Sequence, residues 1–378
     1  MTSSPDTNEW AAAMAAFDAW AELQEAQRGA WLAELAAAQP ALHERVVSLI
    51  RADRDAEDLS FLSSGDAAPA PALANLEGKR LGPWLIERLI GSGGMGQVWL
   101  ARRTDGLYEG RAAIKLMRLA VADAGANERF AREGRLLGRL NHPNIARLLD
   151  AGVTPSGERF LVLEYVEGER IDRWCDEHRL TVAERVALFV AVCKAVAHAH
   201  ENLVVHRDLK PSNIFVAEGG DVKLLDFGVA KLLDDEAGES TELTREAGAA
   251  LTPQYAAPEQ LSGGMVSTAT DVYGLGMVIY GLLSGSRPYA TDSRALASRP
   301  GAEAPSRPLW SLPPDEGAAE RIATQRATSV KALRKTLRGD LAVVVAKAIK
   351  TDPGERYRAV PDFADDLQRV LERRPITA

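Results

Sequence analysis

Cysteine is almost absent from this sequence: only Cys175 and Cys193 occur among 378 residues. A secreted domain stapled by several disulfides and a zinc site built from several cysteines are therefore excluded, and a reducing compartment is the natural environment. Both cysteines lie in apolar, helix-like surroundings, where a free thiol packs as a small core residue. We therefore expect a cytoplasmic protein whose cysteines belong to its core.

An excess of positive charge is also missing, because 53 Asp and Glu outnumber 45 Lys and Arg and leave a net charge of −8. This balance disfavours a nucleic-acid binder. No apolar run reaches the roughly 18–20 residues of a membrane-spanning helix, since the most apolar stretch, 186–199, contains Lys194. The N-terminus lacks the basic start and apolar run of a signal peptide. We expect a soluble chain without a membrane segment, and a longer membrane-anchored parent protein stays open.

The composition that remains, 46% hydrophobic and 26% charged, is typical of a globular protein with a real core. The length suggests two or three domains. Residues 1–57 are predicted to form an acidic helical extension, because Trp10, Met14 and Phe17 recur along one stripe of a helix. Residues 58–79 are rich in Ser, Gly, Pro and Ala and are typical of a linker.

The remainder, residues 80–374, divides into a β-rich part (80–167) and a helical part (168–374). Residues 291–330, rich in Ser, Pro, Ala and Gly, indicate a long insertion or an ordered loop. The predicted strands are Trp84–Ile90, Gln97–Arg103, Ala112–Met117 and Phe160–Tyr165, and the predicted helices are 127–140, Ile171–His178, Val182–Asn202, Ala269–Leu283, Leu341–Ile349 and Pro361–Glu372.

A glycine-rich turn runs through Gly91-Ser92-Gly93-Gly94-Met95-Gly96, between two of the predicted strands. Glycines at these positions let the backbone approach phosphate oxygens closely. A dinucleotide-binding loop would open directly into a helix, so that interpretation is disfavoured. By itself the pattern also fits an ordinary glycine hairpin.

An apolar strand, Ala112-Ala113-Ile114-Lys115, ends in a lysine. Burying that cation is costly unless an anion meets it. Nucleotide phosphates and a carboxylate on the following helix are both available. Glu133 is the best-placed carboxylate of that helix, and Glu128 is a second choice.

Three further motifs follow in the helical part. The segment His206-Arg207-Asp208-Leu209-Lys210-Pro211-Ser212-Asn213 puts a base, a cation and a metal-binding amide into one loop. Asp226-Phe227-Gly228 comes after a strand-like stretch, and Ala257-Pro258-Glu259 comes some 30 residues later.

With these five motifs in this order and spacing, the sequence resembles the eukaryotic-like serine/threonine protein kinases of bacteria. The resemblance covers residues 80–374. It implies an α+β, two-lobed protein kinase fold with the nucleotide in the cleft between a β-rich N-lobe (80–167) and a helical C-lobe (168–374).

The resemblance also assigns roles to residues that match the family's motifs. Lys115 would bind the ATP phosphates and pair with Glu133, while Asp208 would accept or orient the proton of the substrate hydroxyl. Lys210 would neutralise the transferring phosphoryl group, and a lysine at this position marks Ser/Thr specificity. Asn213 and Asp226 would hold Mg²⁺ (or Mn²⁺). Phosphoryl transfer needs these charges because it depends mostly on alignment and electrostatic stabilisation.

The adenine pocket follows by the same resemblance. The glycine loop would cover the phosphates, Leu163 would precede the hinge, and the backbones of Glu164 and Val166 would bond the edge of the adenine ring. The residues expected to contact ATP are Leu89, Gly91, Ser92, Gly93, Gly94, Met95, Gly96, Val98, Ala113, Lys115, Glu164, Val166 and Phe215.

Other matches lie in both lobes. Leu137, His206, Phe227 and Asp271 match an internal hydrophobic and polar spine. Glu259 is expected to pair with Arg356. Thr252 matches the threonine that meets the catalytic loop, and Leu251 departs from the glycine that commonly precedes it, which puts the shape of the peptide-facing loop in question.

Two other functions are weighed. A catalytically silent scaffold is disfavoured by the intact Lys115, Asp208, Asn213 and Asp226. A small-molecule kinase of the aminoglycoside or choline type is disfavoured by the Ala257-Pro258-Glu259 motif and the long activation segment, which belong with protein substrates.

Regulation is expected in that activation segment. Arg207 precedes the catalytic Asp208 and in such kinases commonly receives a phosphate. Thr241 and Thr244 are the candidate autophosphorylation sites, and unmodified loop hydroxyls are the alternative.

The acidic extension has two interpretations. About 50 residues make only a marginal core. The extension therefore either packs on the kinase domain or on a second copy in a homodimer, or forms a self-contained hairpin on its tether. The candidate contact residues are Trp10, Phe17, Trp20 and Trp31.

Overall fold

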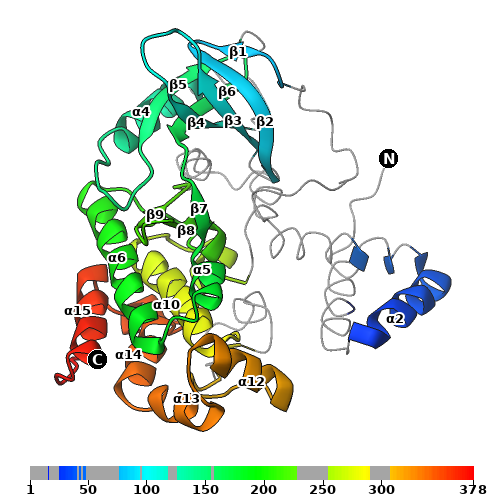
Figure 1. Ribbon diagram of the computed structural model, residues 1–378, viewed down its shortest axis with the longest axis vertical. Helices are drawn as coiled ribbons and strands as arrows, with labels where there is room; N and C mark the ends of the chain where they lie inside the picture. Colours follow the sequence, from blue (N-terminus) through cyan, green and yellow to red (C-terminus); the bar gives the residue numbers. More distant parts are fainter. Residues whose placement is uncertain are drawn as a thin grey trace. The chain divides into compact units, whose positions relative to one another are not determined.

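The computed structural model describes residues 16, 25–40, 42–43, 46–47, 76–93, 96–117, 126–154, 157–227, 254–289 and 307–378. The chain divides into two compact units, Met1–Ser64 and Gly65–Ala378 (Figure 1). No helix in these described ranges is long and apolar enough to cross a membrane.

The first unit contains helix α2 (Glu25–Ala38), which ends two residues before Pro40. Trp31 and Leu35 pack with Leu42 around the fully buried Val46. Trp10, Phe17 and Trp20 lie outside the described residues.

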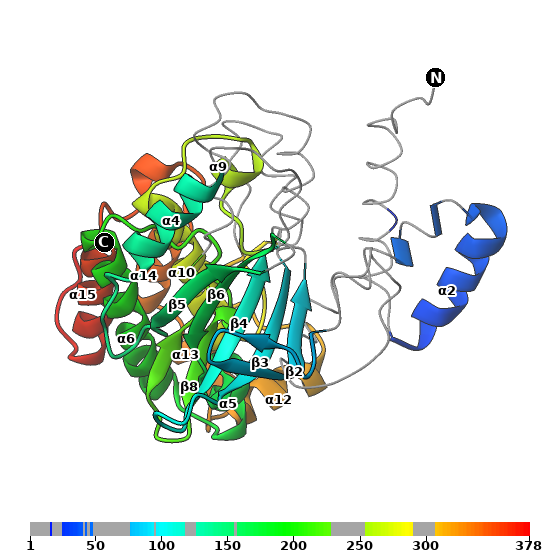
Figure 2. The same cartoon turned by 90° about the horizontal axis from the view of Figure 1, so that it is seen from above.

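The N-lobe of the second unit is an antiparallel six-stranded sheet in the order β1-β2-β3-β4-β6-β5, and its strands lie side by side in Figure 2. Trp84, Trp99 and Ile114 are buried together in its core. The elements are β1 (Arg80–Leu81), β2 (Trp84–Gly93), β3 (Gly96–Arg103), β4 (Arg111–Met117), helix α4 (Ala126–Leu137), β5 (Leu148–Val153) and β6 (Arg159–Glu164).

The four predicted strands of this lobe are all present, and the predicted helix is α4. Strand β5 was not predicted. It is an edge strand whose side chains, including Leu149 and Val153, are mostly exposed. Without one buried face, β5 lacks the alternating pattern that marks a half-buried strand.

The C-lobe is helical around a small three-stranded sheet in the order β7-β8-β9. Its elements are β7 (Gly168–Arg170), α5 (Ile171–Glu177), α6 (Val182–Glu201), the 3-10 turn Pro211–Asn213, β8 (Ile214–Ala217), β9 (Val222–Leu224), α9 (Pro258–Leu261), α10 (Thr268–Ser284), α12 (Glu316–Gln325), α13 (Val330–Thr336), α14 (Asp340–Ala348), the 3-10 turn Pro353–Glu355 and α15 (Val360–Leu371).

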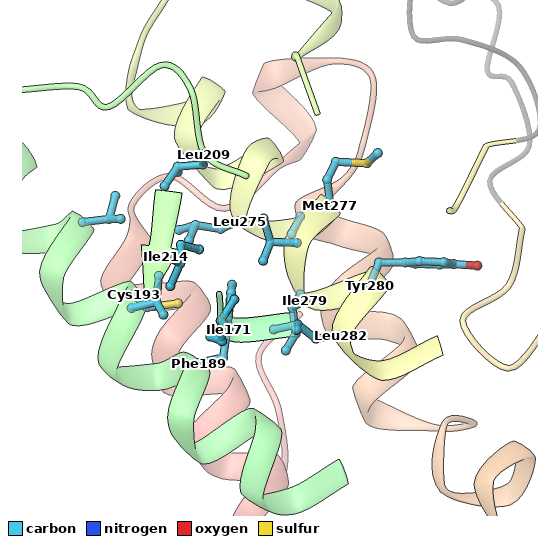
Figure 3. Close-up of a cluster of buried hydrophobic side chains, with 14 of the residues drawn as sticks. Ile171, Phe189, Cys193, Leu209, Ile214, Leu275, Met277, Ile279, Tyr280 and Leu282 are labelled. Carbon is cyan, nitrogen blue, oxygen red and sulfur yellow. The ribbon is translucent and has the colours of Figure 1, made fainter. Parts of the chain in front are cut away.

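Helices α6 and α10 form the centre of this lobe. Helix α6 begins at a capping box of Thr181 and Glu184, and α10 ends at Gly285 in a left-handed conformation (φ 66°) that glycine adopts without strain. Both helices are buried over much of their length, and Figure 3 shows side chains of both in one apolar core. Cys175 and Cys193 are free and buried, which confirms their predicted place in the core.

The interpretation of 291–330 as an insertion or loop is wrong for its second half. Helix α12 lies within this range, and its N-terminus is capped by Asp315, which accepts a bond from the Ala318 N–H. The polar composition hid the helix, because only Ala319, Ile322 and Ala323 are buried. Residues 290–306 lie outside the described residues.

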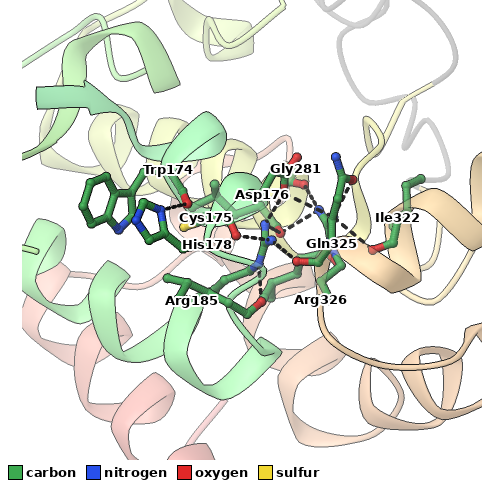
Figure 4. Close-up of polar contacts among 12 residues, drawn as sticks. Trp174, Cys175, Asp176, His178, Arg185, Gly281, Ile322, Gln325 and Arg326 are labelled. Carbon is green, nitrogen blue, oxygen red and sulfur yellow. Dashed lines mark hydrogen bonds and ion pairs between the residues drawn. The ribbon is translucent and has the colours of Figure 1, made fainter.

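A buried polar cluster joins α12 to the rest of the lobe (Figure 4). The guanidinium groups of Arg185 and Arg326 both contact Asp176, at 2.7 and 3.4 Å. Arg326 also donates to the carbonyls of Leu282 and Leu283 at the end of α10, both at 2.8 Å. Burial, followed by the nearby charge of Arg185, lowers the pKa of Arg326 to about 10, so the side chain remains charged at neutral pH.

Candidate active site

The glycine-rich turn forms the hairpin between β2 and β3. Gly91 pairs with Val98 and Gly93 pairs with Gly96 in this ladder. Val98 in turn lies opposite Lys115 on β4. The sheet register therefore places the base of the glycine turn, Val98 and Lys115 in one row. Gly94 and Met95, at the tip, lie outside the described residues.

Lys115 is a buried cation, with 4% of its surface exposed. Its Nζ pairs with Asp226 Oδ1, 111 positions later in the chain. An anion thus meets the lysine, as burial of its charge requires. Glu133 belongs to α4, but its side chain lies outside the described part, so the Lys115–Glu133 pair stays a prediction.

The loop 206–213 gathers the predicted catalytic groups. Lys210 Nζ lies 3.0 Å from Asp208 Oδ2. Asn213 Nδ2 donates to the same oxygen at 3.2 Å and to the Asp208 carbonyl at 2.7 Å. These bonds hold a nearly buried carboxylate beside a cation in a fixed orientation.

Asp271 of α10 holds the backbone of this loop. Its carboxylate accepts bonds from the N–H groups of His206 and Arg207 at 2.7 and 2.8 Å, and lies 2.7 Å from His200 Nε2. Arg207 has a left-handed backbone (φ 69°), a conformation that costs energy for a non-glycine residue and is kept here by these bonds.

The ring of His206 links the loop to the segment around Asp226. It packs on the Phe227 ring at 4.7 Å between centroids, and its Nε2 bonds to the Leu225 carbonyl at 3.0 Å. Nδ1 accepts the Asp208 N–H at 3.3 Å. One donating and one accepting nitrogen describe a neutral imidazole. Burial accordingly lowers the pKa of His206.

Because the His206 imidazole is neutral in the folded chain, we predict that acid lowers the stability of the fold. Below a pH of about 6.5 the unfolded chain takes up a proton on His206 more readily than the folded chain does, so the free energy of unfolding falls as the pH is lowered. Urea unfolding at several pH values measures this slope. His206→Gln, which removes the titrating group, is expected to have a shallower slope, and equal slopes in both proteins would contradict the assignment.

The predicted adenine contacts come from both lobes. Ala113 of β4 and Phe215 of β8 are buried, Val98 is partly buried, and Leu89 is 43% exposed. Leu89 lies opposite Trp99 on β3, beside the glycine turn. The adenine pocket expected from these four side chains stays a prediction.

The hinge is the short segment 165–167 between β6 and β7. The Glu164 N–H already donates to the Arg147 carbonyl at 2.8 Å. The bonds expected from the backbones of Glu164 and Val166 to the edge of the adenine ring stay predictions. Leu163, just before the hinge, and Val166, within it, are partly buried.

The ion pair predicted between Glu259 and Arg356 is confirmed. Arg356 Nη1 and Nη2 donate to the two carboxylate oxygens at 2.7 and 2.9 Å, and Thr270 Oγ1 donates at 2.9 Å. Burial alone would raise the pKa of Glu259, but the bonds from Arg356 and its charge bring that pKa below its ordinary value. The pair is ionised and connects α9 to α10 and to the turn before α15.

Gln260 was not singled out in the sequence. Its Nε2 donates to the Arg207 carbonyl at 2.8 Å, while its Oε1 accepts the Ala257 N–H at 3.0 Å. It therefore connects α9 to the catalytic loop. A Gln at the third position of a helix is a recognised capping position, and this was the available signal.

The donor set fits Mg²⁺. Asn213 uses its Nδ2 on Asp208, which leaves Oδ1 for a cation, and Asp226 supplies a carboxylate. Magnesium is bound in kinases by one or two such oxygen ligands together with substrate phosphates and water. Asn213 and Asp226 are adjacent through the bond from the Leu225 N–H to the Asn213 carbonyl at 2.8 Å.

The activation segment carries the remaining predicted residues. Thr241, Thr244, Leu251 and Thr252 all fall in 228–253, outside the described residues. Their expected roles stay predictions.

Comparison with known proteins identifies the class. A family model described as the protein kinase domain matches residues 84–357. The chain therefore belongs to the protein kinase family, and the predicted two-lobed α+β kinase fold is confirmed. The PknI kinase domain of Mycobacterium tuberculosis is similar in structure, with a TM-score of 0.55 and 26% identity, and covers 79% of this chain and 100% of that one.

Two relatives in sequence are kinases of bacteria. The serine/threonine-protein kinase PknB of Mycobacterium tuberculosis is 33% identical over 296 residues, 77% of this chain and 43% of that protein. The serine/threonine-protein kinase PrkC of Bacillus subtilis is 32% identical over 300 residues, 79% of this chain and 42% of that protein. The predicted membership among eukaryotic-like kinases of bacteria is confirmed, and the chain spans less than half the length of these two relatives.

Proposed function

We propose that this chain is an ATP-dependent serine/threonine protein kinase. The observation that carries the proposal is the arrangement of Asp208, Lys210 and Asn213, with a shared carboxylate oxygen contacted at 3.0 and 3.2 Å. A base, a cation and an amide within bonding distance provide what phosphoryl transfer to a hydroxyl requires.

The side chains have separate tasks in this mechanism. Asp208 orients the attacking hydroxyl of a Ser or Thr side chain and receives its proton. Lys210 neutralises charge on the phosphoryl group as it moves. Lys115, now paired with Asp226, turns to the ATP phosphates when these supply the anion. Asn213 and Asp226 would hold Mg²⁺, which would neutralise charge on the phosphates; Mn²⁺ has the same oxygen preference.

Protein substrates are proposed because Glu259, Gln260 and Arg356 brace the helix that follows the activation segment against the catalytic loop. Such bracing supports a peptide-binding surface next to Asp208. We place the domain in the cytoplasm because the proposed reaction needs ATP and because its two thiols are free and buried.

The test is transfer of labelled phosphate from ATP with Mg²⁺, with and without a generic basic protein. Labelled protein supports the proposal. Nucleotide binding without transfer would favour the scaffold, and transfer only to a small alcohol would favour the small-molecule kinase.

Autophosphorylation is a further part of the proposal. A phosphate on Thr241 or Thr244 adds about −1.5 to −2 charges and would order the activation segment on Arg207, with one copy acting on another in a transient homodimer. The double variant Thr241→Ala/Thr244→Ala is expected to lose most kinase activity, whereas Ser240→Ala, in the same segment, keeps it. Phosphosite mapping by mass spectrometry and the transfer rate measure this, and full activity of the double variant would exclude it.

A further inference from the structure

An ion pair joins the two lobes next to the hinge. Glu164 is the last residue of β6 in the N-lobe, and Lys223 is the middle residue of β9 in the C-lobe. Lys223 Nζ donates to Glu164 Oε1 at 2.7 Å across 59 positions of sequence. The exposed fractions of the two side chains are 21% and 25%, so the pair is largely shielded from water. Neither side chain has a role in the transfer chemistry described above.

The second oxygen of Glu164 is also held. Oε2 accepts the backbone N–H of Arg147 at 3.2 Å, and Arg147 Nε lies 3.8 Å away. The Glu164 N–H returns a bond to the Arg147 carbonyl at 2.8 Å. Both the backbone and the side chain of Glu164 are therefore tied to the segment that precedes β5.

That segment is itself bonded to β9. Asn144 Nδ2 donates to the Val222 carbonyl at 2.8 Å, the Leu224 N–H donates to the Asn144 carbonyl at 2.8 Å, and the Ala146 N–H donates to the Leu224 carbonyl at 3.0 Å. Ile145 and Leu224 form a parallel bridge. Residues 144–147 and β9 are thus bonded to each other, and Glu164 contacts both of them.

The ion pair lies beside residues that are expected to bind ATP. The backbone of Glu164 is expected to bond the edge of the adenine ring. Lys223 lies directly opposite Phe215, the expected adenine contact of the C-lobe, in the β8–β9 ladder. Opposite residues of an antiparallel pair share a face of the sheet. The ion pair therefore connects the two halves of the adenine site.

We propose that Glu164 and Lys223 are a positioning pair that sets the distance between the hinge peptide and the floor of the adenine site, and thereby the affinity for ATP. This rests on the proposed kinase function. Without the pair, the two halves occupy their binding geometry for a smaller fraction of the time, and the apparent affinity falls by that fraction. The transfer step itself, on Asp208, is unaffected.

The experiment compares Lys223→Met with Lys223→Arg and with Arg102→Met. Arg102 pairs with Glu87 at 2.9 Å, but within the N-lobe sheet, so its variant controls for loss of an ion pair that spans no lobe boundary. Lys223→Met is expected to raise KM for ATP about fivefold with kcat changed less than about twofold, the pattern of a loss in binding alone. Lys223→Arg and Arg102→Met are expected to keep the wild-type KM.

A double-variant cycle assigns the effect to the pair. In a Glu164→Gln background, Lys223→Met is expected to change KM by less than about twofold, because the partner is already lost. An undiminished effect in that background, or an unchanged KM in Lys223→Met, overturns the proposal. If Lys223→Met does not fold, Lys223→Gln takes its place.

Direct titration with ADP separates this proposal from the kinase assignment. A wild-type chain that transfers no phosphate but binds ADP more tightly than Lys223→Met contradicts the kinase function and keeps the positioning pair. A wild-type kinase whose ADP affinity is the same in Lys223→Met contradicts the pair alone.

Discussion

Replacing Asp208 by Asn is expected to reduce phosphoryl transfer by about 10³-fold, the scale of removing a positioned base from a reaction. Asn is nearly isosteric, and its carbonyl oxygen still accepts the bonds that Asn213 and Lys210 now make to Oδ2. The loop therefore keeps its shape, while the negative charge at the attacking hydroxyl disappears. Single-turnover transfer of labelled phosphate measures the loss.

ATP binding and thermal unfolding serve as the internal controls for Asp208→Asn. Both are expected to stay at wild-type values, because Asp208 binds neither adenine nor the metal in this scheme. Asp365→Asn, on an exposed position of α15, is the matched substitution and is expected to leave transfer unchanged. Wild-type turnover in Asp208→Asn would contradict the assignment of the catalytic loop.

Replacing Arg326 by Met is expected to lower the free energy of unfolding by about 3 kcal/mol, because it strips partners from buried carbonyls and a carboxylate. Arg326 is 2% exposed and donates to the carbonyls of Leu282, Leu283 and Ile322 at 2.8, 2.8 and 3.2 Å. The apolar chain of Met offers none of these atoms a donor. Relief of the repulsion between Arg326 and Arg185 offsets part of the loss.

Thermal unfolding measures this effect, with Tm expected to fall by roughly 5–10 °C. Arg334→Met, on an exposed position of the neighbouring α13, is the matched control and is expected to shift Tm by less than about 1 °C. A shift below 2 °C in Arg326→Met would show that water or other groups replace the arginine and that the cluster does not stabilise the lobe.

Much of the site could be predicted because its groups are close in sequence. Asp208, Lys210 and Asn213 lie within one loop of six residues, so a single local conformation brings them together. The same holds for the glycine hairpin, whose turn residues and flanking strands are contiguous. The strands β2, β3, β4 and β6 were predictable because each is buried on at least one face and so carries an alternating or continuous apolar pattern.

The sequence by itself determined that Lys115 needs an anion, because this charge ends an apolar strand destined for burial. The pairing of Glu259 with Arg356 was implied by the resemblance to protein kinases. The tertiary structure decided that Asp226 lies against Lys115, since contacts over 111 positions depend on how the lobes pack. Glu164–Lys223 and the Arg185–Asp176–Arg326 cluster escaped prediction for the same reason. Their residues are ordinary charges in local sequence, and only packing of distant elements shields them from water and gives them partners.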